Sequence, residues 1–137
     1  MRLAFFVVVV GLVGCGSGGE PRLPVAGKVL WRGQPLTSGA VIFRPDSTKG
    51  NNSKHEPRGP IDTNGNYQAA TAQQVGAPPG WYKIGVIATE AGDPKNPYAI
   101  PKSLLPAKYS DPEQSELFME VVTNPAPGMY DITVRPE

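Results

Sequence analysis

The most reactive side chain in the sequence is Cys15, the only cysteine in 137 residues. An apolar run at residues 3–13 precedes it, with the basic residue Arg2 before the run and the small residue Gly14 after it. This order is typical of a secretory signal. As a helix rising about 1.5 Å per residue, the run would cover only about half of a hydrocarbon core of roughly 30 Å. We therefore expect a cleaved signal peptide at residues 1–14 and no membrane span there.

A four-residue motif at the expected cleavage point resembles the lipobox of bacterial lipoproteins: Leu12, Val13, Gly14 and Cys15. The resemblance implies cleavage before Cys15 and a diacylglycerol thioether on its sulfur. One acyl chain, at ~0.8 kcal/mol per buried CH₂, binds a membrane reversibly, whereas further chains make the attachment effectively permanent. The alternative is an ordinary signal peptide, which would leave an exposed thiol without a partner. We expect an extracytoplasmic protein anchored to the inner or the outer membrane through Cys15.

Other side chains with catalytic or metal-binding potential are isolated in the sequence. His55 is the only histidine and lies in a polar stretch, without the further ligands that a zinc site needs. The Gly-x-Ser-x-Gly motif of hydrolases does not occur. Residues 62–66 resemble the start of a calcium loop, but Gly65 occupies the fourth place, not the sixth, and Gln73 replaces the glutamate expected at the twelfth. We expect no catalytic residue, no metal, no cofactor and no enzymatic activity.

The composition favours one β-rich domain. Without residues 1–14, 123 of the 137 residues remain, which is enough for one domain and too few for two. Gly and Pro each occur sixteen times and separate short segments rich in β-branched and aromatic residues, as in domains of many short strands. Removal of Arg2 leaves 12 basic and 12 acidic residues. This balanced charge does not point to a nucleic-acid partner.

Period-two apolar patterns predict about seven strands in an all-β sandwich. They lie at residues 25–32, 40–44, 61–63, 67–71, 81–88, 117–121 and 130–134, with Asn64-Gly65 as a hairpin turn. The polar residues 46–60 are expected to form a long exposed loop. Residues 89–112 are rich in proline and are expected to cross between sheets, with one helical turn near residues 103–105. The expected organisation is a signal peptide (1–14), a lipidated cysteine and flexible tether (15–23) and one domain (24–137).

Several of these segments together resemble the carboxypeptidase regulatory-like domain: residues 25–29, 33–36, 39–43, 62–67 and 79–84. The resemblance covers most of residues 25–134 and implies a seven-stranded transthyretin-like (prealbumin-like) sandwich, an Ig-like Greek-key fold. Residues 105–112, followed by Ser115 and Leu117, look like the small lipoproteins of planctomycete-type bacteria that carry this domain. The family is named after a domain that accompanies peptidases without performing their reaction, so the resemblance implies no catalysis.

Trp81, Tyr98 and Tyr109 are the candidate ligand or partner surface, because large flat side chains give much contact area at low entropic cost. The alternative is that Trp81 covers a sheet edge and Trp31 fills the core. We expect a non-enzymatic structural or protein-interaction module of the cell envelope, held at the membrane by Cys15. Two alternatives stay open: a carbohydrate-binding module that uses the loop aromatics, and an accessory subunit of an envelope peptidase. The expected partner is an envelope protein or a glycan.

Overall fold

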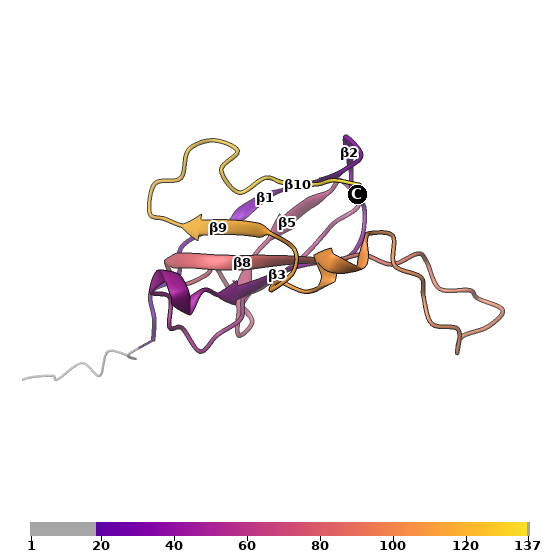
Figure 1. Cartoon of the computed structure of the whole chain (residues 1–137), viewed down its shortest axis with the longest axis horizontal. Coiled ribbons are helices and arrows are strands. Elements are labelled where there is room, and N and C mark those ends of the chain that lie inside the picture. Colours follow the sequence, from indigo (N-terminus) through magenta and orange to yellow (C-terminus); the bar gives the residue numbers. More distant parts are fainter. Residues whose placement is uncertain (1–18, 137) are drawn as a thin grey trace, which may run out of the picture.

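The computed structural model of the chain describes residues 19–136 (Figure 1). This part of the chain is nearly all β, as predicted. Its elements are β1 (Ala26–Trp31), β2 (Gln34–Pro35), β3 (Ala40–Pro45), η1 (Ser47–Lys49), β4 (Arg58–Pro60), β5 (Asn66–Gln68), β6 (Ala70–Thr71), β7 (Gln74–Val75), β8 (Gly80–Ile87), η2 (Ala107–Ser110), β9 (Leu117–Val121) and β10 (Ile132–Val134). The two η elements are short 3₁₀ helices.

The strands form two sheets. In the four-stranded sheet, β1 pairs in parallel with β10 and antiparallel with both β2 and β5. The six-stranded sheet is antiparallel throughout, in the order β7-β6-β4-β3-β8-β9. This arrangement is compatible with a β-sandwich. The described residues contain ten strands, not about seven: β2, β6 and β7 are additional two-residue strands, and β4 was not expected. The strand expected at residues 61–63 is only an isolated bridge between Ile61 and Tyr67.

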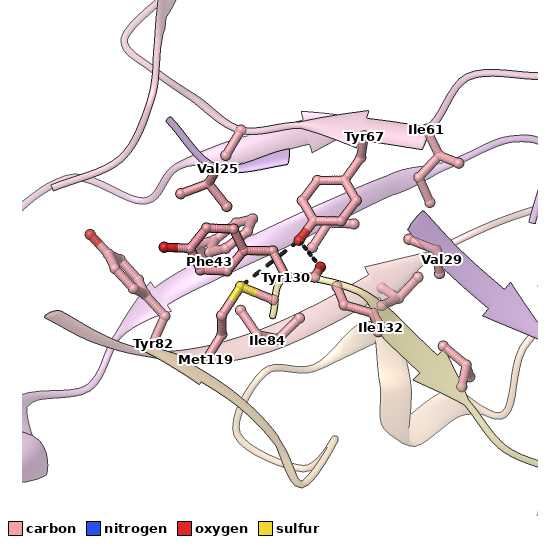
Figure 2. Close-up of a cluster of buried hydrophobic side chains, with 14 of the residues drawn as sticks. Val25, Val29, Phe43, Ile61, Tyr67, Tyr82, Ile84, Met119, Tyr130 and Ile132 are labelled. Carbon is pink, nitrogen blue, oxygen red and sulfur yellow. Dashed lines mark hydrogen bonds between the residues drawn. The ribbon is translucent and has the colours of Figure 1, made fainter. Parts of the chain in front are cut away.

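The core lies between the two sheets and follows the predicted alternation. On β8, Tyr82, Ile84 and Val86 are all buried, as the period-two pattern requires. Phe43 of β3 contacts the Tyr82 ring edge-on, with 5.7 Å between ring centroids, and lies 6.1 Å from the Tyr67 ring. Figure 2 shows this cluster, in which the Tyr67 hydroxyl reaches across the core.

Two connections between strands illustrate how turns are set. Before β5, the Asp62 Oδ1 atom accepts hydrogen bonds from the backbone N–H groups of Asn64 (2.8 Å) and Asn66 (2.9 Å), and Gly65 has a φ of 80°. The predicted turn at Asn64-Gly65 is therefore confirmed. Between β6 and β7, the two turn residues Ala72 and Gln73 also have positive φ angles, of 48° and 67°. Neither is a residue type that favours this region.

Residues 46–60 do not form one long exposed loop, because the segment contains η1 and β4. Asp46 and Asn51 are buried despite their polarity, since their side chains bond to nearby backbone groups. The buried position of β4 is Gly59, where a Cβ atom would lie 2.9 Å from the Tyr67 ring. A strand whose inward residue is glycine carries no apolar alternation, which explains why the pattern did not predict it.

The connection after β8 does not cross between sheets. It joins β8 to β9, which are neighbours in the same sheet. The helical turn expected at residues 103–105 does not form. The Ser103 hydroxyl instead bonds to both the backbone N–H and the backbone oxygen of Leu105. The helical turn instead forms at η2, after Pro106, where proline suits the start of a helix.

The N-terminal part of the described chain is attached to the domain. Leu23 and Ala77 exchange two backbone hydrogen bonds of 2.9 Å each, and the Ser53 hydroxyl donates to Glu20 Oε2 at 2.7 Å. These contacts lie within the stretch expected to be a flexible tether. The expected flexible tether (15–23) is therefore wrong for Glu20 and Leu23, which contact the domain, and its residues 15–18 lie outside the described residues.

Candidate functional site

The outer face of the six-stranded sheet carries the most concentrated group of aromatic and charged side chains. Strand β8 turns Trp81 and Lys83 to this face, and β9 turns Phe118 to it. In the register of the two strands, Trp81 lies opposite Glu120 and Lys83 lies opposite Phe118. Trp81 and Phe118 therefore occupy diagonal positions on one face, within reach of a shared neighbour.

That neighbour is Lys49, the last residue of η1. Its Nζ atom lies 4.1 Å from the centroid of the Trp81 ring and 4.7 Å from the centroid of the Phe118 ring. Both distances are within the range of a cation–π interaction, which contributes about 0.5–1 kcal/mol at an exposed site. The Phe118 residue is 53% exposed. We call Lys49, Trp81 and Phe118 the aromatic–lysine cluster.

Two polar side chains fix η1, and with it Lys49, against β8. Asp46 Oδ1 accepts the backbone N–H of Thr48 at 3.1 Å, and the hydrogen bond from the Thr48 hydroxyl holds the pKa of the Asp46 carboxyl below its usual value. Asn51 Nδ2 donates to the backbone oxygen of Trp81 at 2.9 Å, while its Oδ1 accepts the Ser53 N–H at 3.1 Å. The position of Lys49 is thus determined by a capped turn.

A group of ion pairs lies next to this cluster on the same face. Lys83 Nζ is 2.7 Å from Glu113 Oε2, and Arg44 Nε is 3.1 Å from Glu56 Oε1, with Asp111 and Glu113 further from the guanidinium. Hydrogen bonds to Glu113 and Glu56 raise the pKa values of Lys83 and Arg44, respectively. A shallow depression of about 480 Å³ lies beside these groups. Three of the charged residues that line it, Arg44, Glu56 and Asp111, belong to these ion pairs, as in a structural network.

The segment after η2 covers another part of the outer face. A Cβ atom at Gly85 would lie 3.0 Å from the Pro112 ring, so this ring packs directly on β8. The Ser115 hydroxyl donates to the backbone oxygen of Ile84, and Ser115 is buried. Phe118 of β9, which pairs with Lys83 in the first half of β8, stays half exposed. The outer face is therefore covered toward the end of β8 and more open near its beginning.

Tyr98 lies far from this cluster, on the loop that follows β8. Residues 89–103 form an excursion closed at its base by a bridge between Thr89 and Ser103. Tyr98 is 93% exposed and Ile100 is 91% exposed. Figure 1 shows the loop extending well beyond the end of the sheets. It presents two large apolar side chains to solvent.

Tyr109, the third aromatic residue of the candidate surface, belongs to the core. It is only 6% exposed, and its hydroxyl donates to the backbone oxygen of Arg135 at 3.0 Å. Its position in η2 turns the ring toward the core. The proline-rich sequence around it has no apolar period from which this burial could be predicted. The structure therefore does not bring Trp81, Tyr98 and Tyr109 together, and the prediction of one shared surface is corrected.

Cys15, the residue expected to carry the lipid, and the other lipobox residues Leu12, Val13 and Gly14 lie outside the described residues. Within residues 19–136, no helix is long and apolar enough to cross a membrane. The same part of the chain contains no group of three or more His, Cys, Asp or Glu side chains arranged to hold a metal ion. The Asp62 loop uses its carboxylate oxygen for the turn described above.

Sequence reasoning missed Lys49 and Phe118. The pattern 117–121 did contain a signal for Phe118, because this apolar residue stands on the polar phase between the inward residues Leu117 and Met119. One exposed apolar side chain is common on protein surfaces, but several on one face of a sheet indicate a contact surface. Nothing in the sequence near Lys49 indicates that η1 places it over two rings from other strands.

Comparisons of the chain with models of protein families, with curated proteins and with solved structures gave no match. The resemblance to the carboxypeptidase regulatory-like domain therefore stays a prediction.

Proposed function

We propose that this protein is a lipid-anchored, non-enzymatic β-sandwich that acts as a protein-interaction module of the cell envelope. In this proposal Cys15 carries the lipid, and the loop of residues 89–103 presents Tyr98 and Ile100 to a protein partner. The observation that carries the proposal is that the N-terminal end of the described chain and the exposed apolar loop lie at opposite ends of the domain. The chain arrives at one end of β8, and the exposed apolar loop leaves from the other.

The two ends of β8 show this arrangement. Glu20 and Pro21 line a shallow depression of about 310 Å³ together with Pro78 and Pro79, immediately before β8 begins. The eight residues of β8 then carry the chain about 25 Å. The apolar loop follows directly. An anchor on Cys15 would thus hold one end of the domain near the membrane and direct Tyr98 and Ile100 away from it.

The chemistry of the loop suits contact with a protein. Aromatic side chains are enriched at protein interfaces, because they contribute much buried apolar area with few rotatable bonds. The alternative of a carbohydrate-binding platform receives less support, since Lys49 covers one face of Trp81 and Tyr109 is buried. Tyr98 is the remaining candidate for stacking on a sugar ring.

The proposed fold family is the transthyretin-like sandwich. Its support is the position of the resembling segments: residues 25–29 and 33–36 form the β1–β2 hairpin, residues 39–43 form most of β3, and residues 79–84 open β8. Residues 62–67 form the turn into β5. Each resembling segment thus coincides with a strand or with a turn between strands.

The anchor is tested with the full chain in a bacterial host. Wild-type protein should float with membranes and require detergent for release. Its intact mass should equal that of residues 15–137 plus a lipid on Cys15. The Cys15→Ser variant should appear in the fraction released without detergent. Identical fractionation of the two proteins, or an unmodified Cys15 by mass spectrometry, would contradict the anchor.

The interaction surface is tested by photocrosslinking in intact cells. A photoreactive residue at Tyr98 should yield discrete protein adducts, whereas the same residue at His55, exposed near the other end of the domain, serves as the matched control. With the photoreactive residue at position 100 in place of Ile100, a Tyr98→Ser variant should form fewer adducts than a protein that keeps Tyr98. Equal adduct patterns from Tyr98 and His55 would refute a loop-specific surface, and a peptidase among the adducts would favour the accessory-subunit alternative.

A further inference from the structure

We infer that the aromatic–lysine cluster is a membrane-contact surface, at which the domain rests on the headgroup region of a phospholipid bilayer. The inference rests on the proposed function, since it takes Cys15 to be lipidated. It goes further by assigning a role to Lys49, Trp81 and Phe118 that is distinct from the loop of Tyr98. The occupant of the open half of the sheet's outer face is then the lipid surface itself.

The length of chain between anchor and domain limits where the domain can lie. Five residue steps separate Cys15 from Glu20, and an extended chain spans at most about 3.6 Å per residue, so the reach is about 18 Å. Glu20 bonds to Ser53, and Ser53 bonds to Asn51. Asn51 in turn donates to the backbone oxygen of Trp81. The cluster is therefore attached, through three hydrogen bonds, to the point where the chain arrives.

The side chains of the cluster match the chemistry of a bilayer interface. Tryptophan is enriched at the headgroup level, where an amphipathic ring has both an apolar and a polar neighbour. Lysine places its aliphatic stem along apolar surface and its ammonium among polar headgroups. Lys49 already lies over two rings, at 4.1 and 4.7 Å, with Phe118 half exposed beside it. The cluster thus presents apolar and cationic groups side by side.

The charges around the cluster determine whether binding should depend on anionic lipid. Glu120 lies opposite Trp81 in the strand register, so the cation of Lys49 has an acidic neighbour on the same face. An attraction that depended on anionic lipid would need a larger excess of positive charge. We therefore expect contact through the rings, and expect it with zwitterionic as well as anionic vesicles.

The two tryptophans of the sequence provide an internal comparison. Trp81 belongs to the cluster. Trp31 is the last residue of β1, and it lies about 26 Å along the strand direction from Leu23, which is eight residues earlier and pairs with Ala77 just before β8. The lipidated full chain is reconstituted in vesicles of phosphatidylethanolamine and phosphatidylglycerol, with or without brominated lipid as fluorescence quencher. In a Trp31→Phe variant, the remaining Trp81 should lose fluorescence in brominated vesicles. In a Trp81→Phe variant, the remaining Trp31 should not.

Two further variants test the assignment without disturbing the core. In the Trp31→Phe background, Phe118→Ser should remove most of the loss of Trp81 fluorescence, and Tyr98→Ser, an exposed change at the far end, should preserve it. The same result in vesicles of phosphatidylcholine supports contact through the rings. A loss confined to anionic vesicles would overturn that mode of binding.

Flotation of the same vesicles separates the two proposals. Protein that floats with the vesicles while Trp81 is not quenched would overturn the membrane contact and leave the anchor intact. Equal quenching of Trp31 and Trp81 would also overturn it, because the domain would then have no preferred face. Protein that lacks lipid on Cys15 and does not float would overturn the anchor and the contact together.

Discussion

Replacing Ala72-Gln73 by Asn-Gly should stabilise the protein. Both residues lie in the left-handed region, at φ angles of 48° and 67°, and both are exposed, so the change affects little packing. A residue other than glycine has a cost of roughly 1–2 kcal/mol in this region. Glycine loses about 0.5–1 kcal/mol more backbone entropy on folding than alanine. Because Asn-Gly is the preferred pair for a two-residue hairpin turn, we expect a net gain of about 1–2 kcal/mol.

This gain is measured by urea and thermal unfolding of the full chain in one detergent, followed by tryptophan fluorescence. For a domain of this size the melting temperature should rise by roughly 4–8 °C, with an unchanged urea m-value. The matched control is Gly33→Gln in the β1–β2 turn, where φ is 77° and an added Cβ would meet no atom within 4 Å. It should lose about 1 kcal/mol. A stability unchanged or lowered by Asn-Gly would refute the strain argument.

Three further changes follow from contacts described above. Tyr67→Phe removes the 2.5 Å hydrogen bond to the backbone oxygen of Tyr130 and should lower the free energy of unfolding by about 1–3 kcal/mol in urea titrations. Burial raises the pKa of the Tyr67 hydroxyl, so the unfolded chain loses its proton first as the pH rises. Stability contributed by this group is therefore complete below pH of about 10 and declines above it, and Tyr67→Phe should reduce that decline. Glu113→Gln removes the exposed pair with Lys83 and should cost less than about 1 kcal/mol, with the difference vanishing in high salt. Gly27→Ala places a Cβ against the backbone of Tyr130 and should destabilise the fold by several kcal/mol in the same titrations, or prevent its expression; wild-type stability would contradict the close approach of β1 to that segment.

The strands that pack against the core on one face were the predictable part of the fold. Tyr82, Ile84 and Val86 alternate with outward residues, and β8 follows that pattern. Strand β4 was not predictable in this way, because its inward residue is Gly59. Its place is determined by pairing with β3 and by the room left beside the Tyr67 ring. Such tertiary constraints leave no periodic signal in the sequence.

The candidate site was only partly predictable for the same reason. Trp81 could be singled out because a large ring on an outward phase requires an explanation, and Tyr98 because it lies in a proline-rich connection. The burial of Tyr109 and the position of Lys49 depend on how η2 and η1 fold back onto β8. Those contacts join segments far apart in the chain, which a local pattern cannot specify.

The parallel pairing of β1 with β10 links synthesis of the chain to closure of the domain. The backbone N–H of Lys28 bonds to Asp131, 103 positions later, and Val29 lies beside Ile132. The first strand therefore has an unsatisfied edge until the last residues emerge, and closing so long a loop slows folding. A chain clipped before residue 129 would expose that edge to other strands, which makes it prone to aggregation and to degradation.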